Sequence, residues 1–230
     1  MLYKHVIIIF ATIHRKNDLS QITHFLIRIK MGKVIIVDTE TTGLPKVRNQ
    51  QALVGAGCWP DIVSISWSVF QNGVKESQKT FIIKPDGWAI PIDSIRIHGI
   101  TNERALAEGV SLVSALSTFQ EDLKNTHHVI AHNLQFDKNV IFNAYKWRLN
   151  IDPLAIWPGS VDICSMKLSE LELKLPARGY SPTGYKSPSL AELWKDTFKC
   201  DPPANAHAAD RDVEVLEKIC LTRWKRIFGI

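Results

Sequence analysis

Apolar residues after position 32 follow the periods of strands and helices in turn. β-Branched or alternating apolar runs predict four strands, at 34–37, 61–70, 80–83 and 128–131. The 3.6-residue period of an amphipathic helix predicts four helices, at 111–124, 134–149, 189–198 and 208–228. Ser111 stands where the first of these helices needs an N-cap. Strands first, then helices with one more strand between them, indicate an α/β or α+β domain around a mixed sheet.

Two segments are too long and irregular for simple connections. Residues 45–60 separate the first two strands with a run that is longer than a hairpin loop and suits ligand contact. Residues 177–188 are rich in Gly, Pro, Ser and Tyr, which is typical of a surface loop. We therefore expect both segments to influence which substrate the domain accepts.

The first 30 residues differ in composition from the rest of the chain. An apolar run at 6–13 has the length of a signal-peptide core, but no small-x-small cleavage site follows it. The scarcity of acids leaves a mitochondrial presequence open, and a dispensable extension before a functional start at Met31 is the third interpretation. We predict an N-terminal extension at 1–30 and a single domain at 31–230.

The composition is that of a globular protein. The chain has 230 residues, of which 45% are hydrophobic and 22% charged, and this excludes a disordered or fibrous protein. No apolar run approaches the length of a transmembrane helix, so no membrane partner is expected. Four widely spaced cysteines carry no zinc motif and favour a reducing intracellular compartment, cytoplasm or nucleus. Most of the net charge of +5 lies in residues 1–30, so any nucleic-acid contact on the domain must be local.

Four acids follow or adjoin the predicted buried elements. Asp38 and Glu40 come directly after the first strand, where residues two apart point to the same side. Two such close carboxylates repel each other unless a cation lies between them, and hard divalent cations prefer oxygen ligands. Asp137 lies in the first turn of a predicted helix, and Asp212 lies early in the last helix. Taken singly, each has an ordinary alternative as a turn residue or as a helix N-terminal acid.

His207 precedes Asp212 by five residues. That offset rotates about 140° on a helix, so we expect His207 in the loop that enters the last helix. A histidine on a loop beside carboxylates suits a general base, although a solvated loop residue is the ordinary alternative.

Taken together, these residues resemble the DEDDh 3′–5′ exonucleases, the group that includes DnaQ-like proofreading subunits and oligoribonucleases. The first motif is matched by Asp38-Thr39-Glu40-Thr41-Thr42-Gly43-Leu44. The second and third are matched by Ala131-His132-Asn133 with Phe136-Asp137, and by His207 with Asp212. Further likenesses are Ile97-His98-Gly99-Ile100-Thr101 and Val161-Asp162. The resemblance covers residues 33–222.

This resemblance implies a ribonuclease H-like fold, a central mixed sheet flanked by helices, and a two-metal mechanism. Asp38 would bridge two Mg²⁺ ions, for which Mn²⁺ should substitute. Glu40 and Asp212 would complete the ion that holds the attacking water, and Asp137 would serve the other. His207 would take the proton from that water.

The same resemblance suggests five substrate-binding residues. Thr41 and Thr42 would meet the terminal sugar through their N–H groups and hydroxyls, and Leu44 would wedge against the terminal base. His98 would contact the last nucleotide, or else it is an ordinary histidine at a helix end. Asn133 would orient the site, or else it caps the helix.

Aromatic and basic residues offer further contacts. Trp59 is expected to be open for base stacking, whereas Trp67 is expected in the core because it lies in a strand. A basic and aromatic mixture near the second long loop suits a single-stranded backbone or an ordinary solvated loop, and comprises Lys174, Arg178, Tyr180, Tyr185 and Lys186.

The function expected from these residues is 3′–5′ hydrolysis of single-stranded or mismatched DNA to 5′-mononucleotides, in proofreading or repair. An exoribonuclease of the same family is the first alternative, because sugar discrimination depends on the fit around the 2′-OH. A catalytically idle nucleic-acid-binding module is the distant alternative. Proofreading would require a DNA polymerase or another replication protein as partner.

Overall fold

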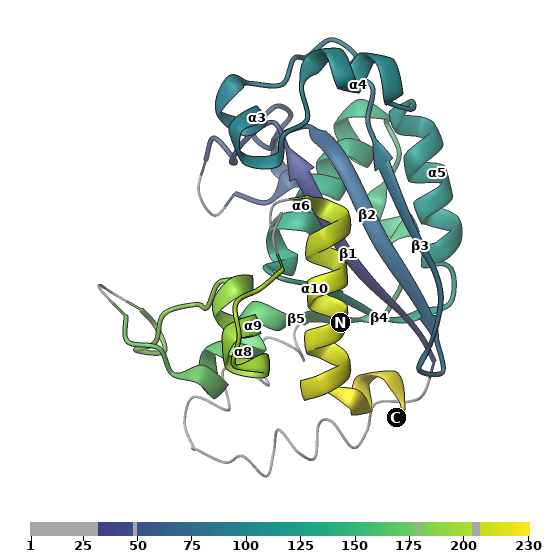
Figure 1. The fold of residues 1–230 in the computed structure, drawn as a ribbon. Helices are drawn as coiled ribbons and strands as arrows, with labels where there is room; N and C mark the ends of the chain where they lie inside the picture. The colour runs from purple at the N-terminus through teal and green to yellow at the C-terminus, as the bar shows by residue number, and fades with distance from the viewer. Residues whose placement is uncertain (1–31, 48–49, 178, 180, 204–207) are drawn as a thin grey trace.

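The computed structural model describes residues 32–47, 50–177, 179, 181–203 and 208–230. The extension predicted at 1–30 lies outside them. A five-stranded sheet forms the centre (Figure 1), in the order β3-β2-β1-β4-β5. Its strands are β1 (Lys33–Thr41), β2 (Ile62–Gln71), β3 (Val74–Ile82), β4 (Thr126–Ala131) and β5 (Val161–Cys164). β1 pairs antiparallel with β2 and parallel with β4, so the predicted mixed sheet is confirmed.

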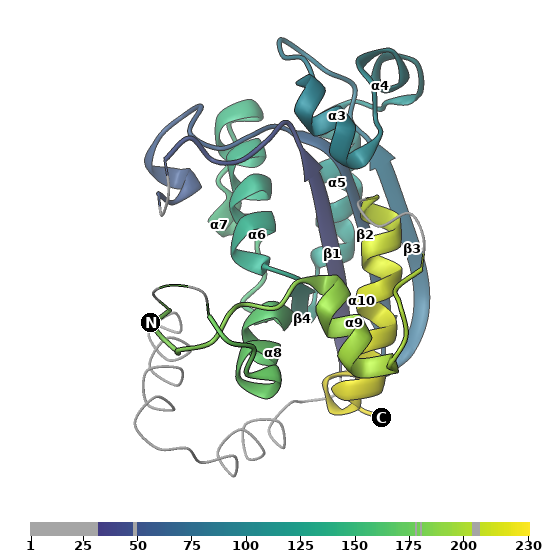
Figure 2. The same ribbon diagram turned by 60° about the vertical axis from the view of Figure 1, so that its left-hand side comes forward.

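Helices cover both faces of this sheet. Figures 1 and 2 show α10 across one face and α5 and α6 against the other. The α-helices are α3 (Ile92–His98), α4 (Asn102–Glu108), α5 (Leu112–Leu123), α6 (Leu134–Asn143), α7 (Pro153–Ile156), α8 (Ser165–Leu173), α9 (Leu190–Phe198) and α10 (Ala209–Arg223). The tighter or wider turns are η1 (Ala52–Val54), η2 (Ala144–Arg148) and η3 (Lys225–Phe228). None of the helices in the described part of the chain is long and apolar enough to cross a membrane.

Alternation along β1 divides the core in two. Ile35 and Val37 pack toward α5 and α6, whereas Val34 and Ile36 pack toward α10. Each face of the strand is therefore buried by a different layer of helices. The same alternation continues toward Thr41, so it decides which side each later residue of β1 faces.

Several element bounds differ from the predicted ones. β1 runs on to Thr41, so the acids predicted to follow the strand lie inside it. β3 begins at Val74 instead of residue 80, because this edge strand is mostly polar and exposed and lacks an apolar signal. The helix predicted at 134–149 changes at Ala144 into a π-helical turn, and the helix predicted to reach 228 ends at Arg223.

Ser111 caps α5 as predicted, accepting a hydrogen bond from the Ser114 N–H at 3.1 Å. Trp67 lies fully buried in the core, also as predicted, and its ring meets Phe119 of α5 edge-on at 5.1 Å. The Trp67 indole donates to the Asp122 carboxylate at 2.7 Å, which joins the end of α5 to the centre of the sheet. All four cysteines lie in the described part and are free thiols.

Replacing Phe119 with alanine is expected to lower the free energy of unfolding by about 3–5 kcal/mol, because a cavity opens beside Trp67. Urea denaturation measures the change. Val113→Ala is the matched control, since Val113 is exposed on the same helix and its loss should change stability by no more than about 0.5 kcal/mol. Similar losses for the two variants would contradict the assignment of this core.

Candidate active site

Two carboxylates project from the end of β1 on one face. Asp38 and Glu40 lie two residues apart, opposite Ser66 and Ser64 of β2. A register shift follows between Glu40 and Thr41, which ends the regular pairing at this point. The small serine side chains leave the space above the strand to the two acids, on the side that α10 covers.

Asp212 reaches the same place from the first turn of α10. One carboxylate oxygen from each of Asp38, Glu40 and Asp212 lies within 4.8 Å of the others. Figure 2 shows why the chain brings them together, since β1 runs between α6 on one side and α10 on the other. Three of the four predicted acids are thus gathered in one cluster.

Asp137, the fourth acid, is held from the opposite face of β1. It lies in the first turn of α6 with 3% of its surface exposed. Its Oδ1 accepts hydrogen bonds from the Thr39 N–H at 3.0 Å and from the Thr39 hydroxyl at 2.8 Å. Thr39 was assigned no role from the sequence. The period of two along the strand is the signal for it, because a residue between Asp38 and Glu40 must face α6.

Burial and mutual repulsion raise the pKa values of acids in and beside the cluster. Burial, followed by the charges of Asp137, Asp212 and Glu40, raises the pKa of Asp38 well above its usual value. Burial, followed by Asp212 and Asp137, raises the pKa of Glu40 to about 8. Burial also raises the pKa of Asp137 to about 7, while its hydrogen bonds from Thr39 act in the opposite direction.

These carboxylates fit a divalent cation. All the donors are hard oxygens, and a cation placed among them would relieve the repulsion that keeps protons on the group. Asp38, Glu40 and Asp212 supply the ligand atoms that converge. Asp137 adds a further negative charge close to Asp38 while Thr39 fixes its orientation.

The predicted substrate residues at the end of β1 and in the loop after it differ in how many of their groups are available to a ligand. The Thr41 hydroxyl donates to the Gly43 carbonyl at 2.7 Å. The Thr42 N–H donates to the Asp61 carbonyl at 3.0 Å, and the Thr42 Oγ1 accepts from the Asp61 N–H, which leaves only its hydroxyl proton for a ligand. Leu44 is 82% exposed, so its side chain is available to a substrate.

His98 and Asn133 lie at the ends of two helices, as a helix-end histidine and as the residue that precedes a helix. His98 is buried at the end of α3, where its Nδ1 accepts from the Ile100 N–H at 3.1 Å. Burial lowers the pKa of His98, whereas a hydrogen bond with the backbone of Thr41 acts in the opposite direction. The ring therefore lies beside the end of β1. Asn133 takes a left-handed backbone with φ of 71° before α6, and its side chain makes no capping hydrogen bond.

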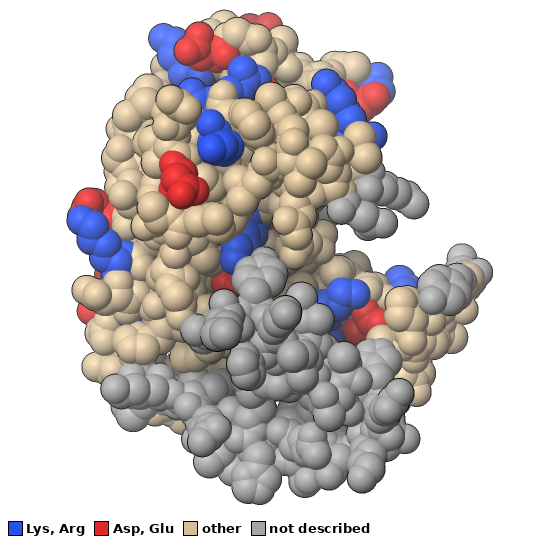
Figure 3. Space-filling view, turned by 180° about the vertical axis from the view of Figure 1, so that it is seen from behind, with Lys and Arg blue, Asp and Glu red and all other residues tan. Residues whose placement is uncertain are grey.

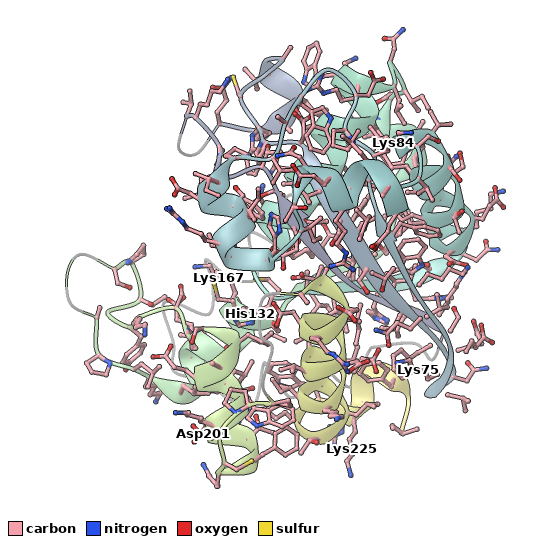
Figure 4. The ribbon with its side chains drawn as sticks, turned by 45° about the horizontal axis from the view of Figure 1, so that its top comes forward. Lys75, Lys84, His132, Lys167, Asp201 and Lys225 are labelled. Carbon is pink, nitrogen blue, oxygen red and sulfur yellow. The ribbon has the colours of Figure 1, made fainter. Side chains whose placement is uncertain are left out.

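His132 joins the site to the second long loop. Its Nδ1 lies 2.9 Å from the Ser165 hydroxyl and its Nε2 lies 3.0 Å from the Pro188 carbonyl. Burial lowers the pKa of His132 to about 4, so the ring is neutral at neutral pH. In Figure 4 it lies where the α8–α9 part of the chain meets the sheet. The motif contained this histidine, but only the structure shows that it holds Pro188.

The other predicted contacts fall in three groups. Trp59 is less open than predicted, because it is half-buried against Phe136 with ring centroids 5.8 Å apart. Lys186, which follows Tyr185 in the second long loop, pairs with Glu192 of α9, and Lys174 ends α8 in a left-handed conformation. Three predicted residues lie outside the described part of the chain, namely His207, Arg178 and Tyr180.

The surface around the two long loops is hollowed. Figure 3 shows the hollow between the part of the molecule that carries residues 45–60 and the part that carries residues 174–188. Lys and Arg side chains are interspersed with Asp and Glu on this face, which agrees with the nearly balanced charge of the domain. Any attraction for nucleic acid here is therefore local.

Residues 35–220 match the profile of the RNase_T family, which is described as exonuclease. The chain belongs to this exonuclease family. The predicted resemblance to DEDDh exonucleases is thereby confirmed, and the domain is a nuclease. Family membership also implies dependence on a divalent metal, for which the acidic cluster is suited.

Solved structures of exonuclease I share the fold. The zinc-bound complex of E. coli exonuclease I with single-stranded DNA is 20% identical with a TM-score of 0.62, covering 86% of this chain and 42% of that one. Its complex with a dT13 oligonucleotide is 20% identical with a TM-score of 0.64, covering 86% and 43%. A search of curated protein sequences finds no match. The predicted ribonuclease H-like fold is confirmed, and the chain spans less than half of exonuclease I.

The raised pKa of Glu40 predicts how metal and pH act on stability. A carboxyl that ionises near pH 4.5 when unfolded and near 8 when folded holds its proton more tightly in the native state. Its contribution to stability is therefore present at low pH and is lost as pH rises through that window. In EDTA, we expect the melting temperature to fall by several degrees over this range.

Glu40→Gln should show a shallower fall, because glutamine cannot ionise. Mg²⁺ or Mn²⁺ should raise the melting temperature of the native protein most at about pH 8, where the carboxylates are least protonated, and calorimetry should detect proton release on binding. Parallel curves for both proteins in EDTA would contradict the electrostatic account.

Proposed function

We propose that this domain is a divalent-metal-dependent exonuclease that removes 5′-mononucleotides from the 3′ end of single-stranded DNA. The observation that carries the proposal is the convergence of Asp38, Glu40 and Asp212 within 4.8 Å at the C-terminal end of the central strand of an exonuclease-family domain. Carboxylates at such spacing serve phosphodiester hydrolysis better than they serve packing, because burial together penalises their charges.

The proposed ligand assignment uses all four acids. Asp38, Glu40 and Asp212 would hold one divalent ion, and Asp38 with Asp137 would hold a second. When bound, such ions supply a water of lowered pKa and neutralise charge on the scissile phosphate. Thr39 keeps the Asp137 carboxylate in place through two hydrogen bonds, so Asp137 needs no rearrangement before it can act.

His207 is proposed as the general base that accepts the proton of the attacking water at an imidazole nitrogen. An ordinary histidine pKa near 6.5 leaves the ring neutral and able to accept that proton at neutral pH. Leu44 is proposed to lie against the terminal base, which its exposed side chain permits. The Thr42 hydroxyl is proposed to donate a hydrogen bond to the terminal sugar.

DNA is the proposed polymer because the similar solved structures include exonuclease I bound to single-stranded DNA and to dT13. Mismatched 3′ ends are included, since an unpaired terminus presents the same single strand. In replication or repair a polymerase produces such ends, and a DNA polymerase or another replication protein is accordingly the proposed partner.

A matched pair of variants tests the chemistry. Asp212→Asn should reduce the rate of shortening of a 5′-labelled single-stranded DNA oligomer by about 100-fold or more, since one cluster carboxylate is lost. Asp210→Asn changes the same charge in the same turn of α10 but lies outside the cluster, and it should retain activity. EDTA should abolish shortening, and Mg²⁺ or Mn²⁺ should restore it.

Fragments that shorten from the labelled 5′ end, or equal losses for the two variants, would overturn the proposal. The same assay on an RNA oligomer identifies the polymer. Faster shortening of RNA than of DNA would reassign the domain as an exoribonuclease. Oligomer that is bound but never shortened would indicate the idle binding module.

The role of His207 is tested by its pH profile. His207→Ala should slow hydrolysis by about 100- to 10,000-fold near neutral pH, which is the range for loss of a general base. The deficit should shrink at about pH 9, where hydroxide is more abundant and less assistance is needed. His127→Ala, which removes an exposed histidine on β4, is the control. A loss independent of pH would contradict proton transfer by His207.

A further inference from the structure

The two ends of the loop between β1 and β2, at residues 42–46 and 56–61, line a cavity against the end of α6. Figure 2 shows this loop alongside α6 and α7. The cavity has a volume of about 310 Å³, within the range of small-ligand sites. The side chains that matter most in its lining are Leu44, Lys46, Trp59, Asn143, Trp147 and Arg148.

The walls are held rigidly by hydrogen bonds to the loop backbone. The Ala52 N–H donates to Asn139 Oδ1 at 2.8 Å, and the Ala52 carbonyl accepts from the Trp147 indole at 2.7 Å. The neck of the loop is closed by the paired backbones of Thr42 and Asp61. The cavity therefore exists before any ligand binds, which lowers the entropy that binding must overcome.

Asn143 supports this lining. The residue is 3% exposed, and its Nδ2 donates a long hydrogen bond of 3.4 Å to the Pro60 carbonyl. Both residues line the cavity, so this bond joins the end of α6 to the base of the loop.

The other walls define the rest of that ligand. Trp59 and Trp147 present aromatic surfaces, and the Trp59 ring is fixed by its indole N–H to the Gln50 carbonyl at 2.9 Å. Arg148 and Asp61 neutralise each other through two hydrogen bonds of 2.7 Å. Lys46 is exposed and forms no ion pair with the described residues, so its charge remains for an anion. A flat aromatic ligand with an attached phosphate matches this lining.

We propose that this cavity binds one base of the substrate strand, within a few nucleotides of its 3′ end. The faces of the base meet the tryptophans, and a neighbouring phosphate meets Lys46. Leu44 lines the cavity and follows Glu40 by four residues, so the two lie no more than about 14 Å apart along the chain. This subsite rests on the proposed function and adds a base-binding position to it.

The test combines oligomers that lack one base with a variant whose cavity is filled by a bulky side chain. Single-stranded oligomers carrying one abasic site at each position near the 3′ end are offered to the full-length protein with Mg²⁺. In the native protein, one position should raise KM by about 10-fold, the scale of losing one stacked base. Ala56→Trp places a bulky ring in the cavity from an exposed position. It should raise KM for the unmodified oligomer to a similar extent and abolish the effect of that abasic position, with kcat unchanged.

Two further variants complete the test. Ala107→Trp makes the same change at an exposed position on α4 and should behave as the native protein. Lys46→Ala should reduce the slope of log KM against log salt concentration by about 0.7, the value for one contact with a single-stranded phosphate.

Abasic effects that are identical in the native protein and in Ala56→Trp would overturn the subsite while leaving the exonuclease intact. An effect of Ala56→Trp confined to inhibition by added 5′-mononucleotide would assign the cavity to the free product and overturn its assignment to the strand. Failure of the native protein to shorten any oligomer would overturn the proposed function, and the subsite with it.

Discussion

Repulsion among carboxylates at the end of β1 is the constraint on which the arrangement of this domain depends. Asp38, Glu40 and Asp212 converge within 4.8 Å, and Asp137 adds its charge from behind the strand. The unfolded chain would keep these acids apart and fully hydrated. The folded chain holds them together because the elements that carry them are fixed by apolar packing, with β1 buried on both faces. Because that packing holds the acids together, the cluster must either keep protons on some of its carboxyls or bind a cation.

Helix α6 connects this charged cluster to the substrate side of the molecule. Asp137 in its first turn meets Thr39, and Asn139 half a turn later holds the backbone of the 45–60 loop. Asn143 ends the helix in the cavity wall, and the π-helical turn that follows directs Trp147 to the same loop. One helix and the π-helical turn that follows it therefore position both the proposed metal ligand Asp137 and the side chains that hold the 45–60 loop.

Sequence patterns revealed the sheet and the acids because both depend on short-range periods. The period of two along the first strand is sufficient to place Asp38 and Glu40 on one face. The contact between Thr39 and Asp137 spans 98 positions and depends on how α6 docks, which no local pattern encodes. The π-helical turn had no signature either, and the partial burial of Trp59 was missed because its partner Phe136 lies on another element. His207, the proposed general base, lies outside the described part, so its role still rests on the motif.

The way the 45–60 loop is anchored bears on how this domain selects substrates. The side chains that hold Ala52 belong to α6 and η2, and they bind the loop through its main chain. Loop residues are thus free to change without loss of the anchor, provided that the fully buried position 52 remains small. This arrangement separates the residues that hold the acids from the residues that line the cavity. The carboxylates and Thr39 are set by the sheet, which tolerates little change, whereas the cavity lining can vary on a fixed backbone. In the proposed subsite, changes at positions such as 46 and 56 would therefore alter the selectivity for bases without disturbing the proposed metal ligands.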